Sequence, residues 1–272
     1  MNSKIYLTLA LLLTPGLMIP AQASLRWTSA PVLTPERIKG ADRRTQSAFR
    51  PQNFEATSLE DFPSSKQIST AKALDALDDG RFVLKTAGKN EGNYHWISAS
   101  DKQGLKFAST VHYFSNPGPA PRRMLTQSKA PLEIRPLNLP REHGRYRANE
   151  SWDFMVLADG KPLPNAEVLF ETSNDSSSQL ISNTNGIVSV RFPDDFAAFA
   201  EKHAHHDMGG HSAHGRTTAQ FAISVTHNDR ISAFNYRYAE DAFTDKLLWP
   251  AYGLAAAGSL ITGFFLFGRK AV

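Results

Sequence analysis

Between residues 150 and 240 the sequence alternates between apolar and polar residues in short runs. The alternating runs cover residues 152–156, 166–170, 188–192 and 221–225, and an aromatic-rich run follows at residues 231–238. Successive side chains of a strand point to opposite faces, so each run can bury one face and expose the other. Turn signals separate the runs, and Asn185-Gly186 is the strongest of them. The pattern predicts a mainly β fold, an antiparallel immunoglobulin-like β-sandwich, over residues 122–240.

A smaller β unit is expected before the sandwich, over residues 64–121. Apolar residues recur at three-residue spacing within Ser64–Gly80, which predicts one short helix that Gly80 can end. Three runs rich in β-branched and aromatic residues then predict strands at residues 81–86, 93–99 and 105–114. Residues 24–63 carry scattered prolines and no apolar period, so an extended or disordered segment is expected there.

The N-terminus has the three parts of a secretory signal. Lys4 is followed by an almost wholly apolar run at residues 5–19, and Ala21-Gln22-Ala23 supplies small residues at the cleavage site. We therefore predict a signal peptide over residues 1–23, removed after Ala23. The alternative is an uncleaved N-terminal anchor, for which the apolar run is short.

A stretch of 21 uncharged residues, Leu247–Phe267, lies near the other end. About 20 apolar residues are needed to cross a bilayer, and the basic residues Arg269 and Lys270 that follow favour the cytoplasmic side. The expected topology is a single-pass protein of a bacterial inner membrane, with its body in the periplasm and residues 268–272 in the cytoplasm. The alternative is a buried core helix.

Composition excludes several classes of protein. The chain contains no cysteine, so a disulfide scaffold and thiolate metal sites are excluded. The net charge is only +4, with acids and bases interspersed, so a nucleic-acid partner is not expected. Neither a His-Glu-x-x-His nor a Gly-x-Ser-x-Gly pattern occurs, and no nucleophile–base pair is identifiable. The chain is therefore not expected to be an enzyme.

A histidine-rich insertion at residues 194–217 interrupts the strands of the predicted sandwich. Its first part has helical spacing with Asp194 as a possible cap, and glycines follow. Five of the nine histidines of the chain lie within twelve residues: His203, His205, His206, His211 and His214. Imidazole binds Ni, Cu, Zn and Co, so this cluster predicts a site for a divalent transition metal. The alternative is a solvated loop that binds metal incidentally.

A second pair of histidines, His95 and His112, falls on two neighbouring predicted strands. If residues 101–104 close a hairpin, His95 opposes Thr110, and His112 lies diagonally on the same face. Such neighbours are about 7–8 Å apart and can share a metal ion. Two ordinary half-buried sheet histidines are the alternative interpretation, and His143 and His227 are given that interpretation too.

Several segments between residues 80 and 240 resemble a known family. They are residues 131–136, residues 146–157, Asp159-Gly160-Lys161-Pro162-Leu163 and Asn183-Thr184-Asn185-Gly186-Ile187. This part of the chain resembles a periplasmic domain associated with nickel and cobalt uptake, an accessory component of energy-coupling-factor-type metal transporters. The resemblance implies a β-sandwich body, a signal peptide, Ni or Co as the bound metal, and membrane transporter subunits as partners. Some such proteins carry a histidine near the mature N-terminus, but here Ser24-Leu25-Arg26 would begin the chain.

Three functions are compatible with these features. The leading hypothesis is a membrane-anchored, extracytoplasmic metal-binding accessory protein for Ni or Co uptake. The second is a protein that sequesters Cu or Zn for resistance through the same histidines. The third is an anchored β-sandwich that mediates protein contacts without metal.

Overall fold

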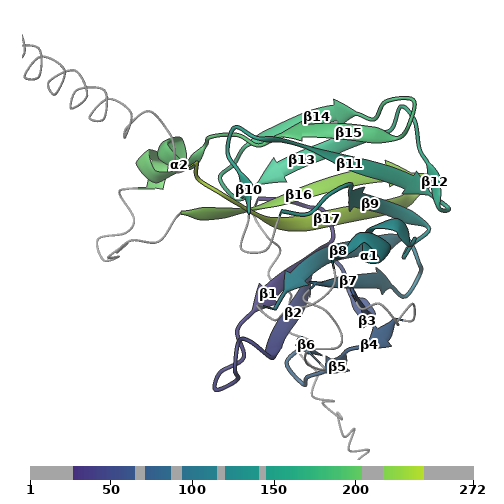
Figure 1. Cartoon of the computed structure of the whole chain (residues 1–272), viewed down its shortest axis with the longest axis vertical. Helices are drawn as coiled ribbons and strands as arrows, with labels where there is room; N and C mark the ends of the chain where they lie inside the picture. The colour runs from purple at the N-terminus through teal and green to yellow at the C-terminus, as the bar shows by residue number, and fades with distance from the viewer. Residues whose placement is uncertain are drawn as a thin grey trace, which may run out of the picture.

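The structure is a computed structural model that describes residues 27–64, 71–86, 94–114, 120–140, 145–203 and 217–241. These residues form a mainly β protein of three sheets, arranged as an upper and a lower half in Figure 1. Most strand pairs are antiparallel and the sheets face one another, as in β-sandwiches. The mainly β, sandwich-like fold class predicted from the sequence is confirmed.

The strands are distributed over the sheets as follows. The first sheet has the order β1 (Val32–Glu36), β2 (Gln46–Gln52), β6 (Phe82–Lys85) and β5 (Asp75–Ala76). The second sheet is nine-stranded, with the order β14 (Ser177–Ile181), β13 (Glu167–Thr172), β16 (Thr218–His227), β17 (Arg230–Ala239), β8 (Lys106–Tyr113), β7 (Tyr94–Asp101), β3 (Ala56–Pro63) and β4 (Lys72–Ala73), while β10 (Tyr146–Arg147) also pairs with β17. The third sheet contains β12 (Lys161–Pro162), β11 (Ser151–Ala158) and β15 (Ile187–Arg191), with β9 (Leu132–Pro136) paired to β11. The described helices are α1 (Arg122–Thr126) and α2 (Phe196–His203).

The large core lies between the third sheet and the nine-stranded sheet and is dominated by aromatic rings. It is built from the inward residues of the alternating runs: in β15, Val188 and Val190 are buried while Ser189 and Arg191 are exposed. Phe221 is fully buried, and its ring centroid lies 4.8 Å from that of Phe192 in an edge-on arrangement. The alternation read from the sequence therefore specifies this core directly.

The small core lies in the lower half, between the first sheet and strands β3, β7 and β8. Its buried side chains are Leu33, Phe49, Phe54, Leu59, Phe82, Leu84, Ile97, Ala99, Ala108 and Phe114. Strand β7 is covered on both faces, because Trp96 belongs to the large core and Ile97 to the small one. This explains why the sequence of β7 shows no clean alternation.

The two cores are joined through the nine-stranded sheet. Strand β17 from the C-terminal part pairs in parallel with β8 from the N-terminal part, with Ile231 opposite Lys106. The side-chain amide of Asn235 reinforces the connection: its oxygen accepts a hydrogen bond from Leu33 N and its nitrogen donates one to Leu33 O, both at 2.9 Å. The predicted boundary between a unit at residues 64–121 and a sandwich at residues 122–240 thus runs through one continuous sheet.

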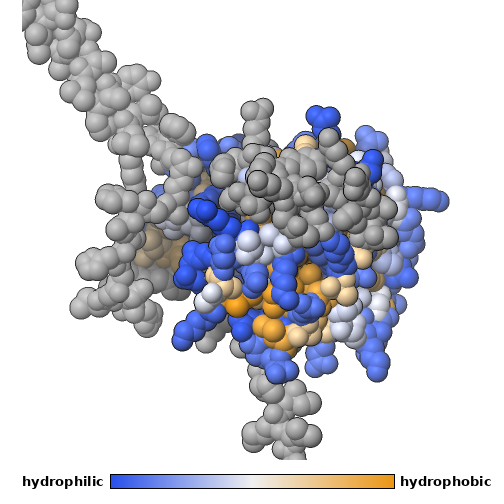
Figure 2. Space-filling model, turned by 60° about the horizontal axis from the view of Figure 1, so that its bottom comes forward, coloured by the Kyte–Doolittle hydropathy of each residue, from blue (hydrophilic) through white to orange (hydrophobic). Residues whose placement is uncertain are grey.

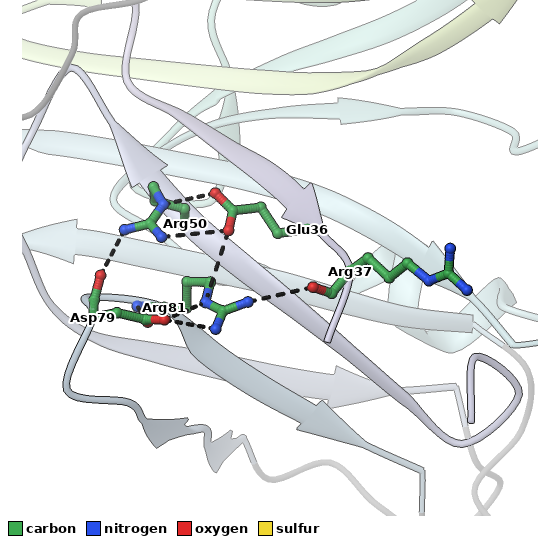
Figure 3. A network of polar contacts seen from close by, with 5 residues as sticks. All are labelled: Glu36, Arg37, Arg50, Asp79 and Arg81. Atoms are coloured by element: carbon green, nitrogen blue, oxygen red, sulfur yellow. Dashed lines mark hydrogen bonds and ion pairs between the residues drawn. The ribbon is translucent and has the colours of Figure 1, made fainter. Parts of the chain in front are cut away.

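A network of charged side chains links neighbouring strands of the first sheet (Figure 3). Arg50 Nε donates to Glu36 Oε1 at 2.6 Å and Arg50 Nη1 donates to Asp79 O at 2.6 Å. Arg81 lies 2.6 Å from Asp79 Oδ2, and its hydrogen bond lowers the pKa of the Asp79 carboxyl. The guanidinium of Arg37 points away from this network, although its carbonyl accepts from Arg81. These contacts link β1, β2 and the turn before β6.

The structure corrects two predictions for the N-terminal part. Residues 24–63 were expected to be extended or disordered, but the described residues from 27 onward form β1, β2 and β3. Residues 64–80 were expected to form a helix, but the described residues 71–80 carry the short strands β4 and β5 instead. In both segments, pairing with neighbouring strands overrides the local spacing of apolar residues, as where Asp75 of β5 pairs with Val83 of β6.

The two predicted membrane-related segments, residues 1–23 and 247–267, lie outside the described residues. Within the part of the chain that the structure describes, neither helix is long and apolar enough to span a bilayer. The signal peptide, the anchor and the topology that they imply therefore stay predictions.

Candidate metal-binding sites

The histidine-rich insertion leaves the sandwich after β15 and rejoins it at β16. The predicted helix is present as α2, which ends at His203. The other four predicted ligands, His205, His206, His211 and His214, lie outside the described residues. The structure thus locates the beginning of this segment but does not test whether its imidazoles converge.

The beginning of the insertion is held by Asp195, whose buried carboxylate accepts three hydrogen bonds. The donors are Thr172 Oγ1 at 2.9 Å, Asn174 Nδ2 at 2.9 Å and the Tyr238 hydroxyl at 2.5 Å. Burial, with a contribution from this contact, raises the pKa of Tyr238, so its hydroxyl remains a donor at any physiological pH. Charge-assisted bonds of this kind are stronger than neutral ones. The start of α2 is therefore fixed to the wall of the large core.

Helix α2 adds a hydrophobic attachment to this polar one. The Phe196 ring lies 5.1 Å from that of Tyr238, and Phe199 N donates to Asp195 O at 3.0 Å to form the first helical turn. The sequence had suggested Asp194 as the cap, but its carboxylate makes only a 3.4 Å contact with Asn149 Nδ2. The adjacent Asp195 is the anchor, which the helical spacing alone could not distinguish.

A second candidate lies in the small core, where His95 of β7 contacts Asp61 of β3. His95 Nδ1 is 2.9 Å from both carboxylate oxygens of Asp61. The side chains of His95 and Asp61 are 0% and 3% exposed. His95 Nε2 is buried and has no hydrogen-bond partner among the described residues. Sequence reasoning missed Asp61, because β3 was not predicted.

His112 lies directly opposite His95, not diagonally as predicted. The β7–β8 ladder pairs His95 with His112 and Tyr94 with Tyr113, a register shifted by two residues from the predicted one. In the hairpin loop the backbone turns at Gly104, which has φ +67°. Asp101 Oδ1 accepts hydrogen bonds from the backbone nitrogens of Leu105 and Lys106. The backbones of the two histidines are therefore closer neighbours than the sequence suggested.

His112 faces a cavity between the two halves of the molecule. The cavity has a volume of about 240 Å³ and is lined by Pro35, Phe49, Thr110, Val111, His112, Tyr113, Thr218, Ala219, Gln220, Asn235, Tyr236 and Arg237. Burial lowers the pKa of His112 to about 3, with smaller contributions from His95 and Arg237. The ring is consequently neutral at physiological pH and offers a nitrogen lone pair.

Other titratable groups in the described structure do not form a metal cluster. No group of three or more His, Asp or Glu side chains suited to a metal ion occurs among the described residues. His227 contacts Asn228 in the β16–β17 turn at 3.1 Å, and His143 lies outside the described residues. The ordinary interpretation given to His227 from the sequence agrees with this position.

A buried lysine that the sequence analysis did not identify lies in the segment between α1 and β9. Lys129 Nζ is 2.5 Å from Gln127 O, 3.5 Å from Glu133 Oε1 and 4.5 Å from the centre of the Trp96 ring. Burial lowers the pKa of Lys129 to about 8. These contacts attach the segment between α1 and β9 to the nine-stranded sheet, which is a structural role.

Comparisons with known proteins show no family. No family model matches the chain, and no curated protein matches it. Among solved structures, a DUF3823 family protein from Bacteroides ovatus aligns over 77% of this chain and 98% of its own, at 7% identity and a TM-score of 0.28. A tandem-repeat region of a large adhesion protein aligns over 78% of this chain, at 12% identity and a TM-score of 0.25, and the chain spans half of that region. At these scores neither neighbour carries a functional argument, and neither is named for metal uptake.

Proposed function

We propose that this chain is a membrane-anchored, extracytoplasmic accessory protein that captures a divalent transition metal, with Ni or Co as the favoured ions. The observation that supports this most strongly is the presence of five histidines within residues 203–214. Imidazoles at this density are typical of binding sites for late transition metals. The role is non-enzymatic: the captured ion would be passed to transporter subunits in the inner membrane.

The attachment of the insertion supports this proposal. Asp195 and Phe196 fix the start of α2 to the large core, so His203 lies at the end of a helix with a defined origin. A ligand-bearing segment with an anchored start loses less conformational freedom when it closes around an ion. The sandwich thus serves as a rigid support for the metal-binding segment.

The proposal is tested by titrating the full chain, purified in detergent, with Ni(II). The decisive variant replaces all five histidines of the segment with alanine, and His227→Ala serves as the matched control. We expect the five-histidine variant to bind Ni(II) at least ten-fold more weakly than the parent, and the control to bind normally. Binding by the parent should weaken as the pH falls through about 6.5, because protonated imidazole cannot ligate. Equal Ni(II) affinity of parent and five-histidine variant would refute the proposal.

The same segment could serve copper or zinc resistance in place of uptake. The two roles differ in the metal that is bound most tightly, which can be measured by competition among Ni, Co, Cu and Zn for the parent protein. The genes beside this one separate them by partner, since a permease and an ATPase indicate uptake whereas an efflux pump indicates resistance.

A role in protein contacts without metal has one specific observation in its favour. Figure 2 shows a compact apolar area, surrounded by hydrophilic residues, on the face of the lower half that is turned toward the viewer. Apolar areas with a polar rim are typical of contact surfaces. If metal titration fails, this face is the next to test, by charge substitution and measurement of binding to membrane extracts.

A further inference from the structure

The imidazole of His95 is oriented so that one nitrogen is left available. A carboxylate only accepts hydrogen bonds, so the contact of Asp61 with His95 Nδ1 places the proton on Nδ1. In the neutral ring, Nε2 then carries the lone pair and can accept a hydrogen bond or bind a metal ion. This nitrogen is buried and has no hydrogen-bond partner among the described residues. Buried polar atoms are nearly always paired, and leaving one unpaired destabilises the fold by about 1–3 kcal/mol. An Asp–His pair with the distal nitrogen free is also the arrangement by which proteins orient a metal-binding histidine.

A second histidine lies on the neighbouring strand, directly opposite His95. His112 is the direct cross-strand partner of His95, and directly opposed Cβ atoms are about 4.5–5.5 Å apart. Both rings contact Phe114 edge-on, with centroids 5.3 Å away for His95 and 4.5 Å away for His112. Phe49 closes the other side of His112 at 5.6 Å. Two imidazoles thus share one aromatic enclosure.

The cavity next to His112 provides access and space. It also contains Gln220, whose Oε1 is buried without a partner among the described residues. An ion entering from this cavity would meet His112 first, and a water molecule in the cavity could complete its coordination. Arg237, which lines the same cavity, adds positive charge.

These surroundings favour an ion of low charge and low coordination number. Zn(II) and Ni(II) require four or more ligands, and a second positive charge near Arg237 in an aromatic enclosure is costly. Cu(I) is satisfied by two or three nitrogen ligands, and its single charge would balance the Asp61 carboxylate through the imidazole of His95. We propose that His95 and His112 together bind one Cu(I) ion between the first sheet and the nine-stranded sheet, with Asp61 as the positioning residue. This site goes beyond the proposed function and does not depend on residues 203–214.

The test uses the full chain in which the five histidines of residues 203–214 are replaced with alanine, so that these imidazoles do not mask the response of His95 and His112. Under anaerobic conditions this protein should remove one equivalent of Cu(I) from a chromophoric Cu(I) chelator. Adding His112→Phe should weaken Cu(I) binding at least 100-fold, whereas adding His227→Ala should leave it unchanged. No Cu(I) bound, or equal binding with His112→Phe, would overturn the proposal and leave His95 as a partner of Asp61 alone.

A second measurement covers the case in which His112→Phe does not fold. Nitrogen NMR of labelled histidine in the five-histidine variant should show the Nε2 signal of His95 shifting on titration with Ag(I), a redox-inert substitute for Cu(I). An unchanged Nε2 signal at saturating Ag(I) would contradict the site directly. The Ni(II) test compares the parent with the five-histidine variant, whereas the Cu(I) and Ag(I) tests use the five-histidine variant alone. Failure of the Ni(II) proposal can therefore be distinguished from failure of the Cu(I) proposal.

Discussion

The two hydrophobic cores of this protein share a sheet but differ in what they contain. The large core is a cluster of aromatic and aliphatic side chains, with rings such as those of Phe221 and Phe192 packed edge to face. The small core has fewer buried apolar side chains, and it also contains the polar groups of Asp61 and His95 and the half-buried His112. Burying such groups costs stability that apolar residues would not cost. The large core contains more of the buried aromatic side chains, and the proposed Cu(I) site lies in the small core.

The largest effect is expected from truncating an aromatic residue of the large core. The ring of Phe221 lies within 6.4 Å, between centroids, of the rings of Tyr146, Phe154, Phe170, Phe192, Phe234 and Tyr238. Phe221→Ala should therefore lower the free energy of unfolding in urea by about 3–5 kcal/mol. Leu84→Ala in the small core should cost about 2–5 kcal/mol, toward the lower end because that core is smaller.

Both variants should unfold in a single transition if the nine-stranded sheet couples the cores. Tryptophan fluorescence and circular dichroism should then give the same midpoint. Two separate transitions for Leu84→Ala would show that the small core unfolds independently, and would contradict the coupling of the two cores through the nine-stranded sheet.

A smaller effect is expected at Gly186, in the turn that packs against β12. Its φ is +72°, and an added Cβ would lie 2.9 Å from both Leu163 N and Val156 O. Gly186→Ala should cost about 2–4 kcal/mol, because left-handed strain and a clash with backbone act together. Gly104→Ala is the matched control: its φ is +67°, but no described atom lies within 4 Å of the added Cβ, so it should cost only about 1 kcal/mol. Equal costs at the two glycines would show that close packing at Gly186 is unimportant.

The smallest effect concerns the pH dependence of the small core. The pKa of folded His112 is about 3, below the unfolded value of about 6.5, so the unfolded chain binds a proton first as the pH falls. The stability contributed by neutral His112 is complete above pH 6.5 and is lost between pH 6.5 and 3, at about 1.4 kcal/mol per pH unit. Between pH 7 and 5.5 the parent should therefore lose about 1.2 kcal/mol more than His112→Phe, measured by urea unfolding. Parallel pH profiles would show that folding does not lower the pKa of His112.

The sequence was sufficient to predict the large core and insufficient to predict the small one. Val188, Val190 and Phe221 occur in runs whose alternation directly reflects one buried and one exposed face. Strand β7 is buried on both faces, so its residues show no period. Strands β1 to β3 depend on partners that local spacing does not reveal, as with Leu33, which bonds to Asn235.

The same limit applies to the candidate sites. The density of histidines in residues 203–214 is a local property, which composition reveals. The pairing of His95 with Asp61 requires β3 to lie beside β7, a contact between residues 34 positions apart. The prediction that His95 and His112 are neighbours was correct, but the predicted register was wrong, because the hairpin loop is centred one residue later in the chain than predicted. Asp195 and Lys129 gave no signal in the sequence that separated them from other charged residues.

The pairing of β17 with β8 has a consequence for the order in which the chain can fold. Residues 27–114 leave the ribosome before residues 230–239 are made, so the strand that completes their sheet arrives last. Until then, the edge of β8 exposes unpaired amides and carbonyls, and Trp96 lacks Phe234, its stacking partner at 5.5 Å. Contacts that distant in sequence also close slowly. The nascent N-terminal half therefore has an unpaired strand edge until β17 is synthesised. Binding by a chaperone should reduce aggregation most during this period.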